Sequence, residues 1–158
     1  MENEELTEAW AKGRKLFFDS VEGLSEEGAS KPYSMGSWSV KDVVAHLVFW
    51  DEELLRSIEA LMRGDRPAFL DQDWDSLNAR EVARRKDQSL EEMLQDLEES
   101  GRGVKSLIAS LDEGQLSLRR GQKWKTWDVT IEWLVSGNIG HDGHHARKIA
   151  ACRNSLRM

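Results

Sequence analysis

The sequence predicts an all-α fold, namely a four-helix bundle in a single domain that spans residues 1–158. Three observations support this prediction. Apolar residues recur at three- and four-residue steps along four long segments, which is the spacing of one helical face. Two prolines occur in the chain, Pro32 and Pro67, and both lie between these segments. A length of 158 residues favours one domain with a sizeable core.

The first long helix is expected over residues 3–24, and the second begins near Ser39. The first carries an apolar stripe of Leu6, Trp10, Phe17, Val21 and Leu24. The stretch Ser25–Gly36 between the two helices contains glycine and proline and is expected to be a loop. Ser39 and Asp42 have the spacing of a capping box, and Gly64 follows the last apolar residue of the second helix.

The third long helix begins at Ser89, which has capping-box spacing to Glu92. Before it, residues 64–75 are expected to form a loop and residues 76–86 a short helix. Within it, two glycines at positions 101 and 103 each cost ~1 kcal/mol relative to alanine. After it, residues 112–126 are expected to form a loop.

The fourth long helix begins near Trp127 or Thr130 and runs to about Arg153. Its inward stripe consists of Leu134, Asn138, His141, His145, Ile149 and Cys152. A histidine pair four residues apart on one helical face can give a metal ion two nitrogen ligands. His46 lies at the edge of the buried face of the second helix and can supply a third.

A divalent metal ion at His46, His141 and His145 would give each buried imidazole a partner and remove the mutual repulsion of protonated rings. The alternative is three unrelated histidines at the edge of the core with ordinary hydrogen bonds. His144 lies ~100° around the helix from His145 and is expected to flank the site.

The connection between the second and third helices supports this grouping. His46 lies ~10 Å into its helix, whereas His141 and His145 lie nearer the end of theirs. Their depths match if the second and fourth helices are antiparallel, which requires a long crossover. The stretch from Gly64 to Ser89 is long enough, since ~10 extended residues span a ~30 Å bundle.

Composition argues against several function classes. The net charge of −7 argues against a nucleic-acid partner, because phosphate contacts need a basic surface, and against electrostatic attachment to membranes. The chain has no apolar run long enough to span a membrane, and its N-terminus lacks the features of a signal peptide. A single cysteine, Cys152, cannot form an intramolecular disulfide. We therefore expect a cytoplasmic protein with no nucleic-acid or membrane partner.

Two segments, Trp38–Leu47 (WSVKDVVAHL) and His141–His145 (HDGHH), resemble the DinB-like (damage-inducible, YfiT-related) family of four-helix-bundle metalloproteins. That family has one histidine early in the second helix and an HxxxH pair in the fourth, and the order and length of the elements agree across nearly the whole chain. The chain departs from the family after the pair, where relatives often continue as His-His-Arg-Gly-Gln. Here Ala146-Arg147-Lys148 follows His145, which bears on ligand orientation and substrate preference.

The resemblance implies an up-down-down-up bundle, with the long crossover between its second and third helices. It further implies a divalent metal ion such as zinc or nickel, a homodimer and a role in the stress response. Some relatives look like thiol-dependent transferases or isomerases that act on electrophilic small molecules. Two function classes follow for this chain. One is a metal-dependent hydrolase or thiol-dependent transferase that acts on a small reactive molecule, with a low-molecular-weight thiol as a partner. The alternative is a non-catalytic bundle that binds or sequesters a small molecule.

Other residues are weaker candidates. Glu53 lies on nearly the same side of its helix as His46 and is a weak candidate for a catalytic base, although a solvated surface position is the favoured interpretation. Asp142 is expected at the surface. The basic, aromatic segment Arg119–Trp127 either covers the pocket mouth and attracts a carboxylate, or packs its tryptophans on the bundle end, which is favoured. Trp38 and Trp50 are expected in the core. Glycines 137, 140 and 143 either allow close helix approach, within the bundle or across a dimer, or are simply tolerated in a well-packed helix.

Overall fold

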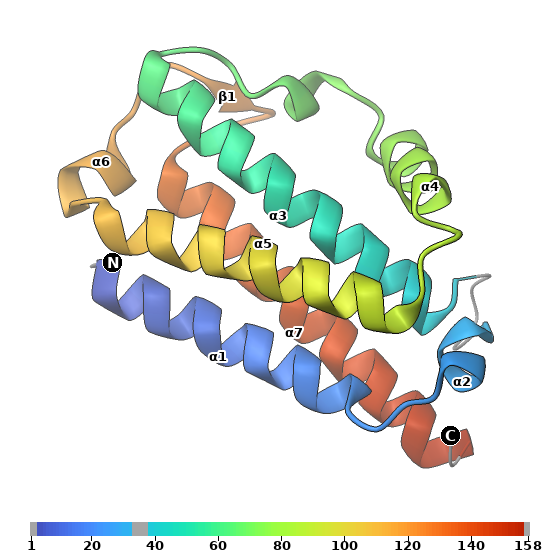
Figure 1. Ribbon diagram of the computed structural model, residues 1–158. Coiled ribbons are helices and arrows are strands. Elements are labelled where there is room, and N and C mark those ends of the chain that lie inside the picture. Colours follow the sequence, from blue (N-terminus) through green and yellow to red (C-terminus); the bar gives the residue numbers. More distant parts are fainter. Residues whose placement is uncertain (1–2, 33–37, 157–158) are drawn as a thin grey trace.

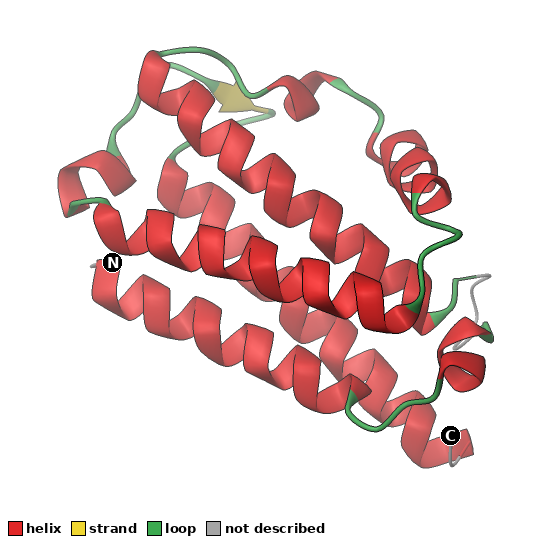
Figure 2. Cartoon of the chain, in the orientation of Figure 1, coloured by secondary structure: helices red, strands yellow, loops and turns green. Residues whose placement is uncertain are grey.

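The computed structural model describes residues 3–32 and 38–156, which are mostly helical (Figure 2). The all-α prediction is confirmed. The four long helices are α1 (Asn3–Val21), α3 (Val40–Arg63), α5 (Leu90–Ser110) and α7 (Ile131–Leu156). The shorter elements are α2 (Glu26–Ser30), η1 (Ala68–Asp71), α4 (Trp74–Arg84), α6 (Glu113–Ser117), β1 (Lys123–Trp124) and β2 (Trp127–Asp128).

Both predicted capping boxes are present. The Ser39 hydroxyl accepts a hydrogen bond from Asp42 N at 3.2 Å, and the Asp42 carboxylate accepts one from Ser39 N at 2.9 Å. Ser89 and Glu92 form the same pair at the start of α5. Gly64 ends α3 in the left-handed conformation with φ +87°, which favours glycine. Side-chain and backbone chemistry encoded locally therefore sets these boundaries.

Three predicted loops contain regular structure, and those predictions were wrong. Residues 64–75 contain η1 and the first two residues of α4. Within Ser25–Gly36, the Ser25 hydroxyl caps the short helix α2 by accepting from Gly28 N; residues 33–37 of that stretch lie outside the described residues. Within 112–126, Asp112 forms a capping box with Gln115 and starts α6. Strand β1 then pairs with β2 as an antiparallel hairpin. The prediction of loops in Ser25–Gly36 and 112–126 relied on their glycines. Ser25 and Asp112, which cap α2 and α6, were the signals for the short helices.

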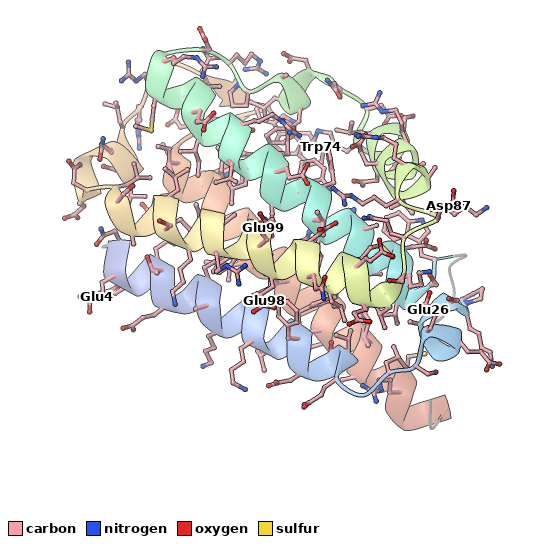
Figure 3. The ribbon with its side chains drawn as sticks, in the orientation of Figure 1. Glu4, Glu26, Trp74, Asp87, Glu98 and Glu99 are labelled. Carbon is pink, nitrogen blue, oxygen red and sulfur yellow. The ribbon has the colours of Figure 1, made fainter. Side chains whose placement is uncertain are left out.

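The long helices pack in pairs. α1 packs most extensively on α7, and α3 on α5, while α3 also packs on α7 and α1 on α5. In Figure 1, α1 and α7 run from left to right, whereas α3 and α5 run from right to left. The connection from α3 to α5 carries η1 and α4 along the outside of α3. At the other end of that connection, Glu26 of α2, labelled in Figure 3, accepts hydrogen bonds from Lys41 Nζ and Leu90 N.

A buried polar layer crosses the middle of the molecule. Arg14 of α1 donates to both oxygens of Asp51 on α3 at 2.7 and 2.8 Å, and to Asp142 on α7 at 3.0 Å. Ser100 of α5 donates to Asp51 at 2.6 Å. One apolar cluster lies on either side, around Trp10 and around Phe17. Every long helix thus contributes one polar side chain to a layer that separates the two halves of the core.

No helix among the described residues has the length and hydropathy needed to cross a lipid bilayer.

Candidate metal centre

Three histidines from two helices meet beside the polar layer. His46 lies on α3, two turns after its start, and His141 and His145 lie one turn apart on α7. The Nε2 atom of His141 is 2.7 Å from Nε2 of His46 and 2.9 Å from Nε2 of His145. One ligand nitrogen from each ring lies within 4.8 Å of the others. The structure therefore brings together the three residues that the sequence grouped.

Burial keeps these rings neutral. It is the largest cause of a lowered pKa at each ring, and positive charge on neighbouring groups lowers the pKa further. The pKa falls to about 2 for His46, about 3 for His145 and about 4 for His141, from an ordinary value of about 6.5. Neutral imidazoles with converging lone pairs are the form that a metal ion binds.

The donor set fits a divalent metal ion. Nitrogens bound to one tetrahedral zinc ion lie ~3.4 Å apart, given Zn–N distances of ~2.1 Å, so small ring movements would accommodate it. Nδ1 of His46 and of His145 is buried, and no described residue accepts a hydrogen bond from either. Aromatic packing holds His46 instead, with the rings of Trp38 and Trp50 centred 5.0 and 6.4 Å from its own. The usual polar support of a ligating histidine is thus replaced here by indoles.

A cavity of about 730 Å³ opens beside His46 and His141. Its walls come from α3, α7, the crossover and the hairpin, and five aromatic side chains dominate them: Trp50, Phe69, Trp74, Trp124 and Trp133. Trp74, labelled in Figure 3 at the start of α4, stacks on Trp124 of β1 at 4.9 Å between ring centroids and 14° between planes. This volume and apolar lining are typical of a small-molecule site.

Two carboxylates occupy unexpected positions. Glu53 was expected at the surface, but it is 9% exposed, lines the cavity and pairs with Arg56 at 2.8 Å. Asp142 was also expected at the surface, yet it is 0% exposed because Arg14 holds it in the polar layer. Burial raises the pKa of Asp142 to about 6, against the opposing charge of Arg14. Both surface predictions were wrong because each assumed that a charged residue beside an apolar stripe is solvated.

The two tryptophans of the Arg119–Trp127 segment lie in different surroundings. Trp124 lines the cavity, with the Lys125 ammonium 4.5 Å from its ring centroid, whereas Trp127 is exposed. The segment therefore contributes to the cavity wall as well as packing on the bundle. Trp38 packs against the core cluster around Phe17 and Trp50 against the cluster around Trp10, as predicted, and Trp50 also lines the cavity.

The glycines of α7 do not serve close packing inside the bundle. A methyl group on Gly137 or Gly140 would meet no described atom within 4 Å. Gly137 lines the cavity, where the missing side chain leaves space for a ligand. His144 is exposed and also lines the cavity, outside the group of three converging histidines.

Residues 9–149 match the sequence family described as the DinB superfamily. The chain belongs to this superfamily. A search of curated protein sequences finds no match. Three solved structures share the fold over nearly the full length of both chains. They are the colibactin self-resistance protein ClbS in complex with double-stranded DNA (20% identity, TM-score 0.79, 99% of this chain and 95% of that chain), an uncharacterised protein from Escherichia coli UTI89 (17%, 0.81, 99% and 95%) and the sibling lethal factor precursor DfsB (16%, 0.83, 100% and 98%).

The ClbS complex corrects one expectation. The net charge of −7 was taken to exclude a nucleic-acid partner, but a protein of the same fold has been crystallised with double-stranded DNA, and the exclusion is overturned. The physical reason is that net charge sums over the whole surface, whereas phosphate contacts depend on local charge. A cleft of about 540 Å³ between α3 and α4 is lined by Arg56, Arg63, Arg66, Arg80 and Arg84.

Proposed function

We propose that this DinB superfamily protein binds a divalent metal ion, zinc or nickel, at His46, His141 and His145. The ion would serve a reaction on a small molecule in the adjacent cavity, as in a metal-dependent hydrolase or thiol-dependent transferase. The convergence of three neutral imidazole nitrogens at the wall of a 730 Å³ aromatic cavity carries the proposal. The opposed directions of α3 and α7 in Figure 1 support an up-down-down-up bundle that brings the histidines together.

Bound there, a divalent ion supplies a Lewis acid that lowers the pKa of a bound water or thiol. The chain's own residues would do the rest. The indoles of Trp50, Trp74 and Trp124 bind an apolar body and exclude water from the histidines. The Glu53 carboxylate, held by Arg56, faces the same cavity and is the candidate to accept a proton there.

Metal analysis of protein purified without a histidine tag tests the proposal. We expect about one equivalent of metal per chain, and its loss on single replacement of His46, His141 or His145 by alanine. His144→Ala is the matched control, because His144 lines the cavity outside the converging group and its variant should keep the metal. Wild-type protein without stoichiometric metal, whose melting temperature a chelator leaves unchanged, would refute the metal site.

Turnover separates the enzyme from a sequestering protein. Metal-loaded protein is incubated with a set of electrophiles, with and without a low-molecular-weight thiol. Consumption that needs both the metal and the thiol supports a transferase, and consumption without the thiol supports a hydrolase. Saturable binding without consumption supports the non-catalytic alternative.

Contact with nucleic acid is a second candidate function, favoured by the arginine-lined cleft between α3 and α4. Its five arginines face three carboxylates, those of Glu53, Asp65 and Glu81, which leaves a net charge of +2 on the lining of a chain with net charge −7. Arg80 and Arg84 have the most exposed side chains of the five, and both pair with Glu81. Their remaining donors can contact backbone phosphates.

Fluorescence anisotropy of a labelled DNA duplex at low and moderate salt tests this second function. Arg80→Gln combined with Arg84→Gln should weaken binding and reduce its salt dependence, because two phosphate contacts are lost. Arg102→Gln, on the exposed face of α5, is the control for loss of charge. Equal affinities of the double variant and the control would contradict a role for the cleft.

A further inference from the structure

Two asparagine side chains flank the histidines in the cavity wall. Asn78 comes from α4 and Asn138 from α7, one turn before His141, and both line the cavity. Each amide accepts a hydrogen bond from an indole. Trp50 Nε1 donates to Asn78 Oδ1 at 2.7 Å, and Trp10 Nε1 donates to Asn138 Oδ1 at 3.0 Å. Asn138 shares the inward stripe of its helix with His141 and His145, whereas nothing in the sequence pattern connects Asn78 with the site.

The indoles fix which end of each amide faces the cavity. An indole N–H can only donate, so the amide oxygen must face it, and the NH₂ group must lie on the opposite branch of the planar amide. Trp10 lies in the core on α1, so the NH₂ of Asn138 is the branch left toward the cavity, where no described residue accepts a hydrogen bond from it. Trp50 turns the Asn78 amide in the same way, and Trp50 and Asn78 both line the cavity. Two oriented amides thus offer NH₂ donors in the cavity that His46 and His141 also line.

The other residues that line the cavity determine which hydrogen-bond acceptor a ligand can bring to the asparagines. No lysine or arginine of the described residues lines this cavity, and Glu53 supplies its one carboxylate. A carboxylate or phosphate ligand would therefore lose its hydration without gaining a cationic side chain. A neutral carbonyl oxygen needs only hydrogen-bond donors. The aromatic walls, including the stacked pair Trp74 and Trp124, suit a flat apolar body attached to that carbonyl.

We propose that Asn78 and Asn138 donate hydrogen bonds to the carbonyl oxygen of a neutral aromatic amide or ester bound in the cavity. This inference rests on the proposed function, because it names the substrate class of the same site. It also replaces the less favoured alternative, in which the Arg119–Trp127 segment attracts a carboxylate, since the basic side chains of that segment do not line the cavity. Both asparagines are assigned as specificity-determining residues.

Binding of benzamide, benzoate and benzylamine to metal-loaded and metal-free protein tests the assignment. The three probes share a phenyl ring and differ in the polar end: a neutral carbonyl, an anion and a cation without an acceptor. Titrations are followed by the indole N–H signals of ¹⁵N-labelled protein, where Trp10 and Trp50 report on their asparagine partners. Wild-type protein should bind benzamide more tightly than either other probe in the metal-free form.

Asn78→Asp and Asn138→Asp keep an oxygen for the indole and replace the NH₂ donor with a second oxygen. Each should raise the dissociation constant of benzamide about tenfold or more. Gln95→Glu, the same amide-to-carboxylate change on the exposed face of α5, should leave it unchanged. Should an aspartate variant fail to fold, Asn138→Leu and Asn78→Leu remove the donor without adding charge and should weaken benzamide binding in the same way.

The measurements distinguish failure of this inference from failure of the proposed metal site. Protein that binds stoichiometric metal but holds benzamide equally well in wild-type and asparagine variants would overturn this inference and leave the proposed function standing. Protein without metal that binds benzamide in an asparagine-dependent manner would support the inference and refute the metal site. Tighter binding of benzoate than of benzamide to metal-free protein, or no binding of benzamide to either form, would also overturn the inference.

Discussion

Replacing Arg14 by methionine should destabilise the protein strongly. Arg14 is the only cation hydrogen-bonded to the buried carboxylates of Asp51 and Asp142 among the described residues, with four nitrogen–oxygen contacts between 2.7 and 3.4 Å. Removing one partner of a buried ion pair costs ~3–5 kcal/mol, because the remaining charge is left uncompensated. For a chain of this size that loss lowers the melting temperature by roughly 6–20 °C. Urea unfolding followed by circular dichroism measures the change in the free energy of unfolding.

The matched control is Arg102→Met, which removes an exposed arginine 3.5 Å from Glu98 and should cost less than ~1 kcal/mol. The Arg14→Met penalty should also shrink as the pH falls toward about 5. Arg14 opposes the burial that raises the pKa of Asp142, so without the arginine the folded-state pKa of that carboxyl rises further above the unfolded value of about 3.9. The folded variant therefore binds more protons than the folded wild type and gains more stability on acidification. Equal losses in the two variants at about pH 7 would refute the claim that the polar layer stabilises the fold.

Three further predictions concern the glycines, the histidines and the aromatic wall. Gly103→Ala should stabilise the protein by up to ~1 kcal/mol, because the added methyl lies 3.5 Å from its nearest neighbour, Leu55. Gly101→Ala should not stabilise the protein, because its methyl would lie 3.1 Å from Trp10 and Arg14. Urea unfolding measures the free energy of unfolding of both variants, and an equal increase in the two would contradict this difference in packing. Metal affinity, measured by cobalt titration, should change less than about threefold between about pH 7.5 and pH 5.5, because burial lowers the pKa of every ring to about 4 or below. If the three histidines had ordinary pKa values, the metal affinity would fall ~1000-fold over the same interval. Trp124→Ala should weaken benzamide binding while metal stoichiometry is unchanged, and loss of metal in this variant would show that the wall supports the histidines.

Local chemistry made much of the fold predictable. Ser39 with Asp42 and Ser89 with Glu92 fixed two helix starts, because a capping box needs only residues three apart in the chain. The polar layer was not predicted, although its signal is present: Arg14 interrupts an apolar stripe between Trp10 and Phe17. A charged residue in an apolar stripe predicts a buried ion pair only if the oppositely charged residues that pair with it are known. Here those residues lie on helices far apart in the chain.

The pairing of His141 with His145 was predictable for the same local reason, since the two share one helical face. His46 was joined to them through the length of the crossover and the family resemblance. The cavity beside the three histidines was not predictable. Its walls include Trp74, Asn78 and Trp124, which belong to connections whose path depends on tertiary packing and leaves little periodic pattern. The donors of Asn78 and Asn138 depend further on which indole faces each amide, a relation between helices that spacing within one segment does not express.

The stacking of Trp74 on Trp124 has an evolutionary consequence. The outer wall of the cavity belongs to the crossover and the hairpin, which meet through this pair, whereas the histidines belong to two long helices of the bundle. Mutations at the cavity-facing positions of the two connections can therefore reshape what enters the site without changing the three imidazoles. A lineage with this architecture can exchange one ligand for another by altering surface segments while inheriting the same centre.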